Sequence, residues 1–123
     1  PAQPYSSEDL DWTNKKSRSS IEMNDKSFRP AIDNKVDDIE QYDRIFIGFP
    51  IWWYVAPTII NTFLEQYDLT GKKIIPFATS GSSDMGKTNA GLQSSCKGAT
   101  LCEGKRFDAG AKAAELKSWA EKF

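Results

Sequence analysis

The stretch RIFIGFPIWWYVAPTIINTFLEQYDLTGKKIIPFAT, residues 44–79, contains two short apolar runs separated by an amphipathic segment. Residues 44–49 carry the first run, which ends at Pro50 and is typical of a strand buried on both faces. Residues 57–67 begin with a proline, which suits a first helical turn, and continue with apolar side chains at helical spacing. Residues 73–79 carry the second run. A strand, a helix and a strand in this order predict two parallel strands joined by a crossover helix.

Two further apolar segments lie toward the C-terminus. Residues 99–103 fit a third strand, with an extension to Phe107 left open, and residues 111–122 carry the apolar stripe of a core-facing helix. Residues 1–40 are polar and punctuated, so we expect a long surface segment there, with a short helix starting at Ser6. Strands that alternate with helices predict an α/β fold of three layers, in which a parallel sheet lies between helices.

The length and composition indicate one domain over residues 1–123. The chain is 39% hydrophobic and 12% aromatic, which is enough to enclose a single core. Sixteen basic and 17 acidic residues leave a net charge of -1, so there is no basic footprint for nucleic acid or for an anionic membrane surface. The apolar runs are shorter than the ~20 residues that a bilayer span needs. We therefore expect neither a nucleic-acid nor a membrane partner.

Histidine and cysteine usage narrows the chemistry further. The chain has no histidine, which excludes histidine-dependent triads and histidine-ligated metals. Cys96 and Cys102 match neither a metal knuckle nor a redox C-x-x-C, and we expect two free thiols in a reducing cytoplasm rather than a disulfide. We predict no catalytic or metal-binding side chain, so that any catalysis would come from a cofactor.

Residues 81–88, GSSDMGKT, fit the phosphate-loop pattern G-x-x-x-x-G-K-[ST] behind an apolar run. A nucleotide site of that kind needs a firm helix after the loop, because the helix N-terminal amides hold the phosphates. Residues 89–95 contain Gly91 and make a poor helix, and no later strand supplies an aspartate for Mg²⁺. We interpret the match as a chance product of a loop rich in glycine and serine.

Taken together, the aromatic loop and the Gly/Ser-rich loop resemble those of the flavodoxin family. The most specific stretches are PIWW at 50–53 and PFATSG at 76–81. Other resembling residues run almost end to end, at Asp9–Trp12, Ser17–Ser19, Met23–Asn24, Arg29–Pro30, Gly48–Phe49, Ala56–Pro57, Thr62–Glu65 and Gly104–Phe107. A central strand ordinarily avoids proline, but the family has one at the position of Pro76. The resemblance implies a flavodoxin-like sandwich with strand order 2-1-3-4-5, of which this sequence would contain strands three to five.

By resemblance, the loops after the family's third and fourth strands clasp the isoalloxazine ring of FMN. The residues implied are Pro50, Ile51, Trp52, Trp53, Tyr54, Thr79, Ser80, Gly81, Ser82 and Ser83. An aromatic face stacked on this flat ring contributes on the order of 1 kcal/mol, and serine and glycine expose backbone groups to the polar edge of the ring. Adjacent residues in an extended loop point in opposite directions. We therefore expect one of Trp52 and Trp53 to fill the core and Trp53 to stack on the flavin.

The sequence lacks counterparts of the family's first strand and of the Ser/Thr-rich loop that holds the FMN phosphate. Each charge-assisted hydrogen bond to a phosphate contributes roughly 1.5–3 kcal/mol, so we expect weakened cofactor binding. Two hypotheses follow. The first is an FMN-dependent redox protein that transfers electrons or reduces small electrophiles such as quinones. The second is a cofactor-free, truncated flavodoxin-type scaffold without catalytic activity.

Absence of the first strand would leave residues 44–49 as an unpaired, apolar edge strand. Absence of the first helix would also uncover the sheet face beside Trp119 and Phe123, and exposed apolar patches of that size mark association sites. We therefore expect self-association, in the simplest form a two-fold homodimer that pairs residues 44–49 of two copies. Completion of the sheet by a separate N-terminal segment is the alternative.

Overall fold

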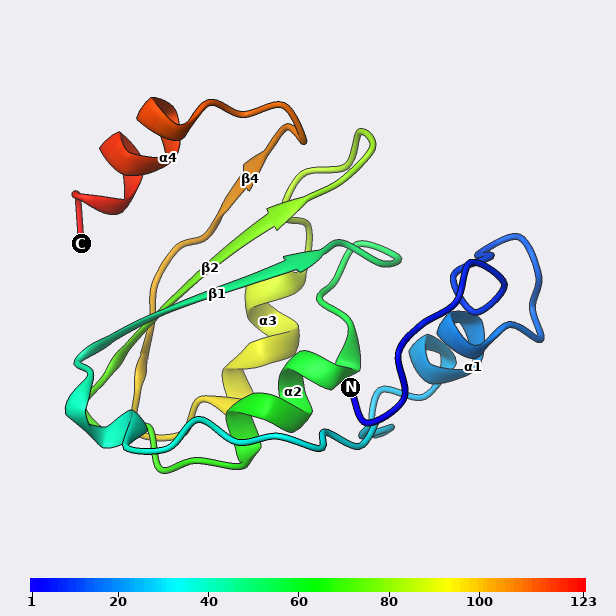
Figure 1. Ribbon diagram of the computed structural model, residues 1–123, viewed down its shortest axis with the longest axis horizontal. Coiled ribbons are helices and arrows are strands. Elements are labelled where there is room, and N and C mark those ends of the chain that lie inside the picture. The colour runs from blue at the N-terminus through cyan, green and yellow to red at the C-terminus, as the bar shows by residue number, and fades with distance from the viewer.

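A four-stranded parallel sheet forms the centre of the computed structural model, which describes residues 1–123 (Figure 1). Its strands are β1 (Arg44–Pro50), β2 (Lys73–Thr79), β3 (Thr100–Leu101) and β4 (Lys105–Phe107). Strand β2 is central, with β1 on one side and with β3 and then β4 on the other, all parallel to it. The pairing of β1 with β2 confirms the crossover predicted from residues 44–79.

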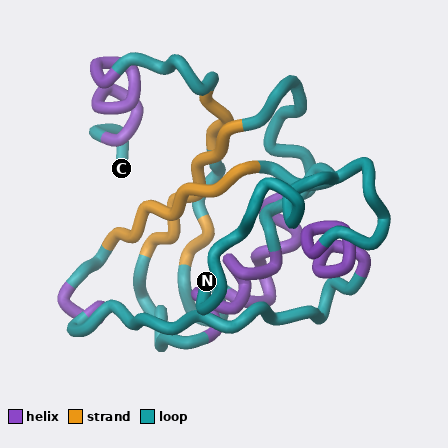
Figure 2. Tube along the Cα trace, turned by 45° about the vertical axis from the view of Figure 1, so that its right-hand side comes forward, coloured by secondary structure: helices purple, strands orange, loops and turns teal.

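Helices lie on both sides of this sheet. The α-helices are α1 (Arg18–Asn24), α2 (Thr58–Glu65), α3 (Thr88–Leu92) and α4 (Ala113–Ala120), and two 3-10 turns are η1 (Ile39–Gln41) and η2 (Gln93–Ser95). Helices α2 and α3 lie together on one side of the strands and α4 lies on the other (Figures 1 and 2). The structure thus confirms the predicted α/β fold in three layers. None of its helices is both long and apolar enough to cross a lipid bilayer.

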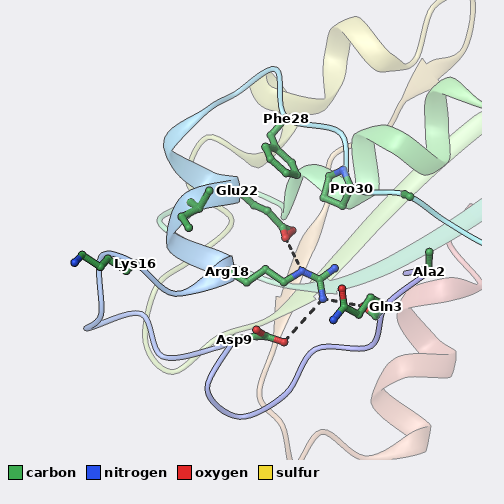
Figure 3. A pocket seen from close by; sticks show the side chains of 10 residues that line it. Ala2, Gln3, Asp9, Lys16, Arg18, Glu22, Phe28 and Pro30 are labelled. Atoms are coloured by element: carbon green, nitrogen blue, oxygen red, sulfur yellow. Dashed lines mark hydrogen bonds and ion pairs between the residues drawn. The ribbon is translucent and has the colours of Figure 1, made fainter.

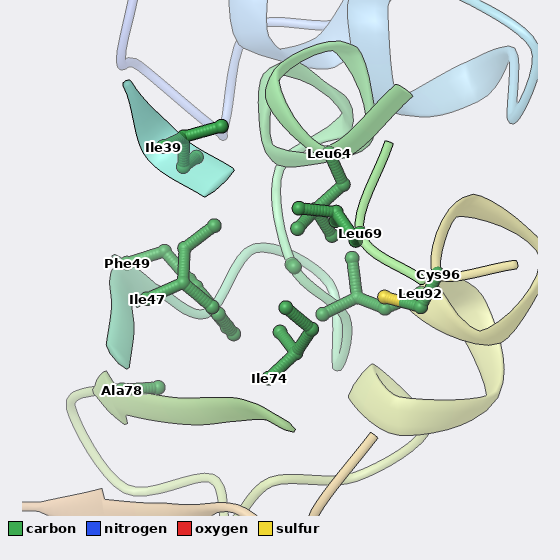
Figure 4. Packing of buried hydrophobic residues seen from close by; sticks show 10 residues of the cluster. Ile39, Ile47, Phe49, Leu64, Leu69, Ile74, Ala78, Leu92 and Cys96 are labelled. Carbon is green, nitrogen blue, oxygen red and sulfur yellow. The ribbon is translucent and has the colours of Figure 1, made fainter. Parts of the chain in front are cut away.

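The main core lies between the sheet and the pair α2 and α3 (Figure 4). Alternate residues of the two long strands enter it, and Leu64 and Leu92 meet them from the helices. Its buried members are Ile39, Ile47, Phe49, Ala56, Leu64, Leu69, Ile74, Ala78, Leu92 and Cys96. Leu64, Ile74 and Leu92 are 0% exposed, so this face of the sheet carries most of the hydrophobic stabilisation.

The opposite face of the sheet is covered only in part. The Trp119 ring on α4 meets the edges of Phe46, Phe77 and Phe107 at centroid distances of 5.8, 6.1 and 5.2 Å. No residue of α4 is buried, and Phe46 remains 40% exposed. The prediction that the 44–49 strand is buried on both faces is therefore wrong, because side chains of β1 alternate between buried and open positions.

Pro76 divides the third predicted strand into two. The carbonyl of Ile74 accepts a hydrogen bond from the Cys102 amide, and Pro76, two residues further on, faces the same neighbour without an N–H to offer. Pairing with β2 breaks off after Leu101 and resumes at Lys105. Gly104 lies in the gap, and a Cβ there would come within 2.8 Å of the Pro76 carbonyl oxygen. The extension to Phe107 is thus a separate strand, β4.

The N-terminal segment folds differently from the prediction. Instead of a helix starting at Ser6, residues 7–10 form a turn in which the Ser6 amide and the Asp9 carboxylate bond at 2.9 Å. The helix begins further on, where Ser17 caps α1 and its hydroxyl accepts from the Ser20 amide.

Candidate functional site

The two loops singled out in the sequence lie side by side at the carboxyl edge of the sheet. Pro50, the last residue of β1, is in register with Thr79, the last residue of β2. The Ile51 amide continues the ladder with a 3.0 Å hydrogen bond to the Thr79 carbonyl oxygen. Residues 50–54 and 79–83 are thereby brought together, as the topology of parallel sheets requires.

The first loop ends in a tight turn with an unusual backbone. Trp52 and Val55 exchange backbone hydrogen bonds of 2.9 and 3.2 Å, and between them Trp53 and Tyr54 have φ of 48° and 68°. This is the left-handed geometry of a two-residue hairpin turn, which ordinarily selects glycine or asparagine. The two aromatic side chains are 44% and 66% exposed. Strain of this kind clusters at ligand clamps, which makes the turn a candidate binding element.

Residues 86 and 87, which continue the second loop toward α3, hold this turn in place. The Lys87 amide donates to the Tyr54 carbonyl oxygen at 2.9 Å. Gly86 has φ of 52°, and a Cβ at that position would be 2.6 Å from the same oxygen. Only glycine permits this approach, so Gly86 sets the distance between the two loops.

Arg106 holds the start of the second loop. From β4, its Nε donates to the Ser80 hydroxyl at 3.1 Å and its Nη2 to the Ser80 carbonyl at 3.0 Å, while Nη1 pairs with Asp108 at 2.7 Å. The Ser80 hydroxyl in turn donates to the Ser83 carbonyl. The amides of residues 81–83 donate no hydrogen bond within the chain. Backbone donors are therefore held in a fixed loop and left free for a ligand.

Trp52 is placed differently from Trp53. Its indole is half-buried and meets the edge of the Tyr5 ring, with centroids 5.4 Å apart and planes at 83°. Trp53 contacts no other aromatic ring of the chain. One tryptophan thus packs on the protein and its neighbour stays open to solvent.

A buried ionic group holds Tyr5 against Trp52. Glu22 is only 3% exposed and accepts from the Arg18 Nε at 2.9 Å and from the Tyr5 hydroxyl. The Arg18 guanidinium also lies 3.8 Å from the centre of the Tyr5 ring. Figure 3 shows Arg18 between Glu22 and Asp9. Burial, followed by the bond to the Glu22 carboxylate, raises the pKa of Tyr5 well above its usual value.

Comparison with models of protein families gives a match over the whole chain. The family model described as flavodoxin matches residues 1–123. The chain belongs to the flavodoxin family. Two solved structures support this: proteins assigned provisionally as flavoproteins, from Bacteroides eggerthii and Bacteroides uniformis, are 48% and 47% identical to it, with TM-scores of 0.89 and 0.91. The alignments cover 99% and 98% of this flavodoxin, and 76% and 77% of the two Bacteroides chains.

A more distant structure shares the fold. It is a flavoprotein from Lactobacillus acidophilus in complex with FMN, 24% identical, with a TM-score of 0.60 over 84% of this flavodoxin and 64% of the other chain. No curated protein matches this flavodoxin.

The exposed residues at the carboxyl edge combine open aromatic surface with free backbone donors. Trp53 and Tyr54 supply open aromatic surface, and residues 81–83 supply free amides. The ten residues predicted from the sequence carry no charged side chain. Arg106 is the residue that sequence reasoning missed. It lay within the resembling stretch 104–107, but its contact with Ser80 spans 26 positions and leaves no local signal.

The phosphate-loop match at 81–88 has a different structure from a nucleotide site. Helix α3 after it has only five residues, so it offers little helix dipole. Thr88, whose hydroxyl would bind Mg²⁺ in such a site, is 0% exposed. These features agree with the interpretation of the match as chance.

Proposed function

We propose that this protein binds FMN between residues 50–54 and 79–83 and acts as a redox protein. The observation that supports this best is the pair of open aromatic side chains, Trp53 and Tyr54, held on a strained turn beside free backbone amides. Membership of the flavodoxin family supports the choice of cofactor, as does the FMN bound by the flavoprotein of the same fold from Lactobacillus acidophilus.

The residues on the two loops would bind, orient and shield the ring. Trp53 would stack on the isoalloxazine and exclude water, while the amides of residues 81–83 would donate to its polar edge. Arg106 acts through Ser80 and is a positioning residue. Bound FMN would supply the electron chemistry, with a redox protein or a small electrophile such as a quinone as acceptor. The free thiols of Cys96 and Cys102 support the reducing cytoplasm as its compartment.

Affinity for FMN is expected to be modest. The ten loop residues carry no cation, so they recognise the ring better than the phosphate. FMN and riboflavin should therefore bind these 123 residues with similar affinity. The competing hypothesis is a cofactor-free scaffold, which predicts a colourless protein that ignores both flavins.

Trp53→Ala is expected to weaken FMN binding about fivefold to tenfold and to leave the thermal midpoint within about 2 °C of the wild type. The physical reason is that Trp53 is 44% exposed and touches no other aromatic ring, so the ligand, not the fold, would bury it. Flavin fluorescence quenching measures the affinity and calorimetry measures the midpoint. Trp12→Ala is the matched control, because Trp12 is 71% exposed on the N-terminal segment. Unchanged affinity in Trp53→Ala would contradict the stacking role.

We also propose that two copies associate through β1. This strand has a neighbour on one side only, and Phe46 leaves 40% of its surface open beside it. An apolar edge of this kind pairs readily with a second strand. Completion by a separate segment, the alternative, would cover the same edge.

Light scattering during size-exclusion chromatography is expected to give about twice the monomer mass of 13.8 kDa. Phe46→Lys places a charge on the sheet face beside that edge, where Phe46 meets Trp119 and Phe123, and should shift the population to monomer. Mass spectrometry of the sample distinguishes a homodimer from a complex with a second fragment. A wild-type monomer at high concentration, without any fragment, would exclude both forms.

A further inference from the structure

A cavity lies beside the Trp53–Tyr54 turn. It has a volume of about 750 Å³, which is within the usual range for small-molecule sites. The turn forms one wall, and the remaining walls come from the start of α2, from α3 and from residues at and after the end of α1. None of residues 79–83 lines this cavity. The cavity therefore shares the Trp53–Tyr54 turn with the proposed flavin site but not the second loop of that site.

Positive charge gathers in this cavity. Lys26, Arg29 and Lys87 line it, and no aspartate or glutamate does, although acidic residues outnumber basic ones by 17 to 16 in the chain. The Arg29 guanidinium is already paired with Glu65 at 2.9 Å. Lys26 and Lys87 form no ion pair. Two ammonium groups are thus free to meet an anion.

A buried hydroxyl without a partner lies in the same wall. Thr58 is 7% exposed and lines the cavity, and its Oγ1 makes no hydrogen bond in the chain. Leaving such a group unsatisfied costs free energy. The oxygen atom itself is shielded from solvent, so it is a feature of the cavity wall and not a ligand contact. Thr58 is also the first residue of α2, an eight-residue helix whose N-cap, Pro57, has no side chain to cap it. The positive end of that helix dipole favours negative charge.

The remaining lining combines apolar and aromatic side chains with the polar Asn61 and Ser94. Trp53, Tyr54, Val55, Ala56 and Leu92 contribute to the apolar and aromatic part. We propose that the cavity binds a small aromatic anion, whose charged group meets Lys26 and Lys87 near the N-terminus of α2 and whose ring packs against the turn. This site does not depend on flavin binding.

Isothermal titration calorimetry with 1-naphthyl phosphate and 1-naphthoate as probes tests the proposal, with 1-naphthylmethanol as the neutral control. The wild type should bind both anions at least tenfold more tightly than the alcohol, because only the anions use the ammonium groups. The ratio between the two anions tells whether a phosphate or a carboxylate fits better. Equal binding of the alcohol, or no binding of either anion, would overturn the proposal.

Variants separate the binding groups from the fold. Lys26→Ala and Lys87→Ala should each weaken anion binding about fivefold to tenfold, while Lys122→Ala on the exposed end of the chain should not. Thr58→Val keeps the shape of the wall and removes the unpartnered, inaccessible hydroxyl, so the anion affinity should be unchanged while the thermal midpoint stays or rises. If Lys122→Ala weakened anion binding as much as Lys26→Ala, the effect would come from net charge alone, and the proposed site would be refuted.

A flavin titration shows whether the two sites are distinct. FMN affinity should be unchanged in Lys26→Ala, because Lys26 lies in the cavity and not on either flavin loop. A parallel loss of FMN and anion affinity in that variant would mean that the cavity is the phosphate end of the flavin site, and the proposal of a separate site would be wrong. Failure of FMN to bind at all would refute the proposed function, but the anion titration would still test the cavity.

Discussion

Glu22→Ala is expected to lower the free energy of unfolding by about 3 kcal/mol and the thermal midpoint by about 10 °C. Glu22 is 3% exposed and holds both the Arg18 guanidinium and the Tyr5 hydroxyl. Its removal takes the closer carboxylate from a largely buried guanidinium and leaves only Asp9, at 4.0 Å, which costs more than the pair itself contributes. Urea unfolding followed by circular dichroism measures the loss.

Glu22→Gln is the matched control for this prediction. The amide keeps the shape and one acceptor oxygen, so a smaller loss of about 1 kcal/mol is expected. Trp52 adds a local readout, because Tyr5 packs on its indole at 5.4 Å. Its fluorescence should move to longer wavelength in Glu22→Ala and much less in Glu22→Gln. An alanine variant as stable as the wild type would show that the buried pair does not hold the N-terminal segment.

Gly86→Ala is expected to destabilise the fold by about 2–3 kcal/mol and to weaken FMN binding about tenfold. A left-handed alanine costs about 1–2 kcal/mol, and here its Cβ would also lie 2.6 Å from the Tyr54 carbonyl oxygen. The overlap is with backbone, which cannot rotate away as a side chain can. The Lys87–Tyr54 hydrogen bond would open and the two loops would separate.

Denaturant unfolding and a flavin titration of the same preparation test this prediction. Gly110→Ala is the control, because an added Cβ there meets no atom within 4 Å and its φ is not positive. We expect that control to match the wild type in both measurements. Full FMN affinity in Gly86→Ala would show that the Trp53–Tyr54 turn does not depend on the second loop.

The sequence was sufficient for the segments whose buried residues are apolar. The 44–79 unit follows from its two apolar runs and from the helical spacing between them. Its strands bury aliphatic residues, and α2 adds the buried Leu64 and the partly buried Ile60 and Phe63. Helix α1 gave no such signal, because the residues it buries are Ser19, Ser20 and Glu22. Its stability comes from the Ser17 cap and from the Arg18–Glu22 pair, and the burial of a pair is not visible in a hydrophobic pattern.

The site was predictable in its position and not in its geometry. Alternating strands and helices bring Pro50 and Thr79 to the same edge of any parallel sheet. The left-handed turn at Trp53 and Tyr54 carries none of the usual turn residues, so nothing local indicated it. The contacts of Gly86 with Tyr54 and of Arg106 with Ser80 are tertiary, and residue type alone does not reveal them.

We expect helix α4 to open as a separate cooperative unit on this sheet. It buries no residue of its own and is held by the rings of Trp119 and Phe123 against Phe46 and Phe77. The free energy of local opening rises with buried apolar contact. We therefore expect a low opening free energy for α4 and a high one for β2. Amide protons of α4 therefore exchange with solvent through openings that leave the parallel strands intact. Each such opening would expose a set of aromatic rings, and the population of the open state would determine for what fraction of the time they are available to another surface.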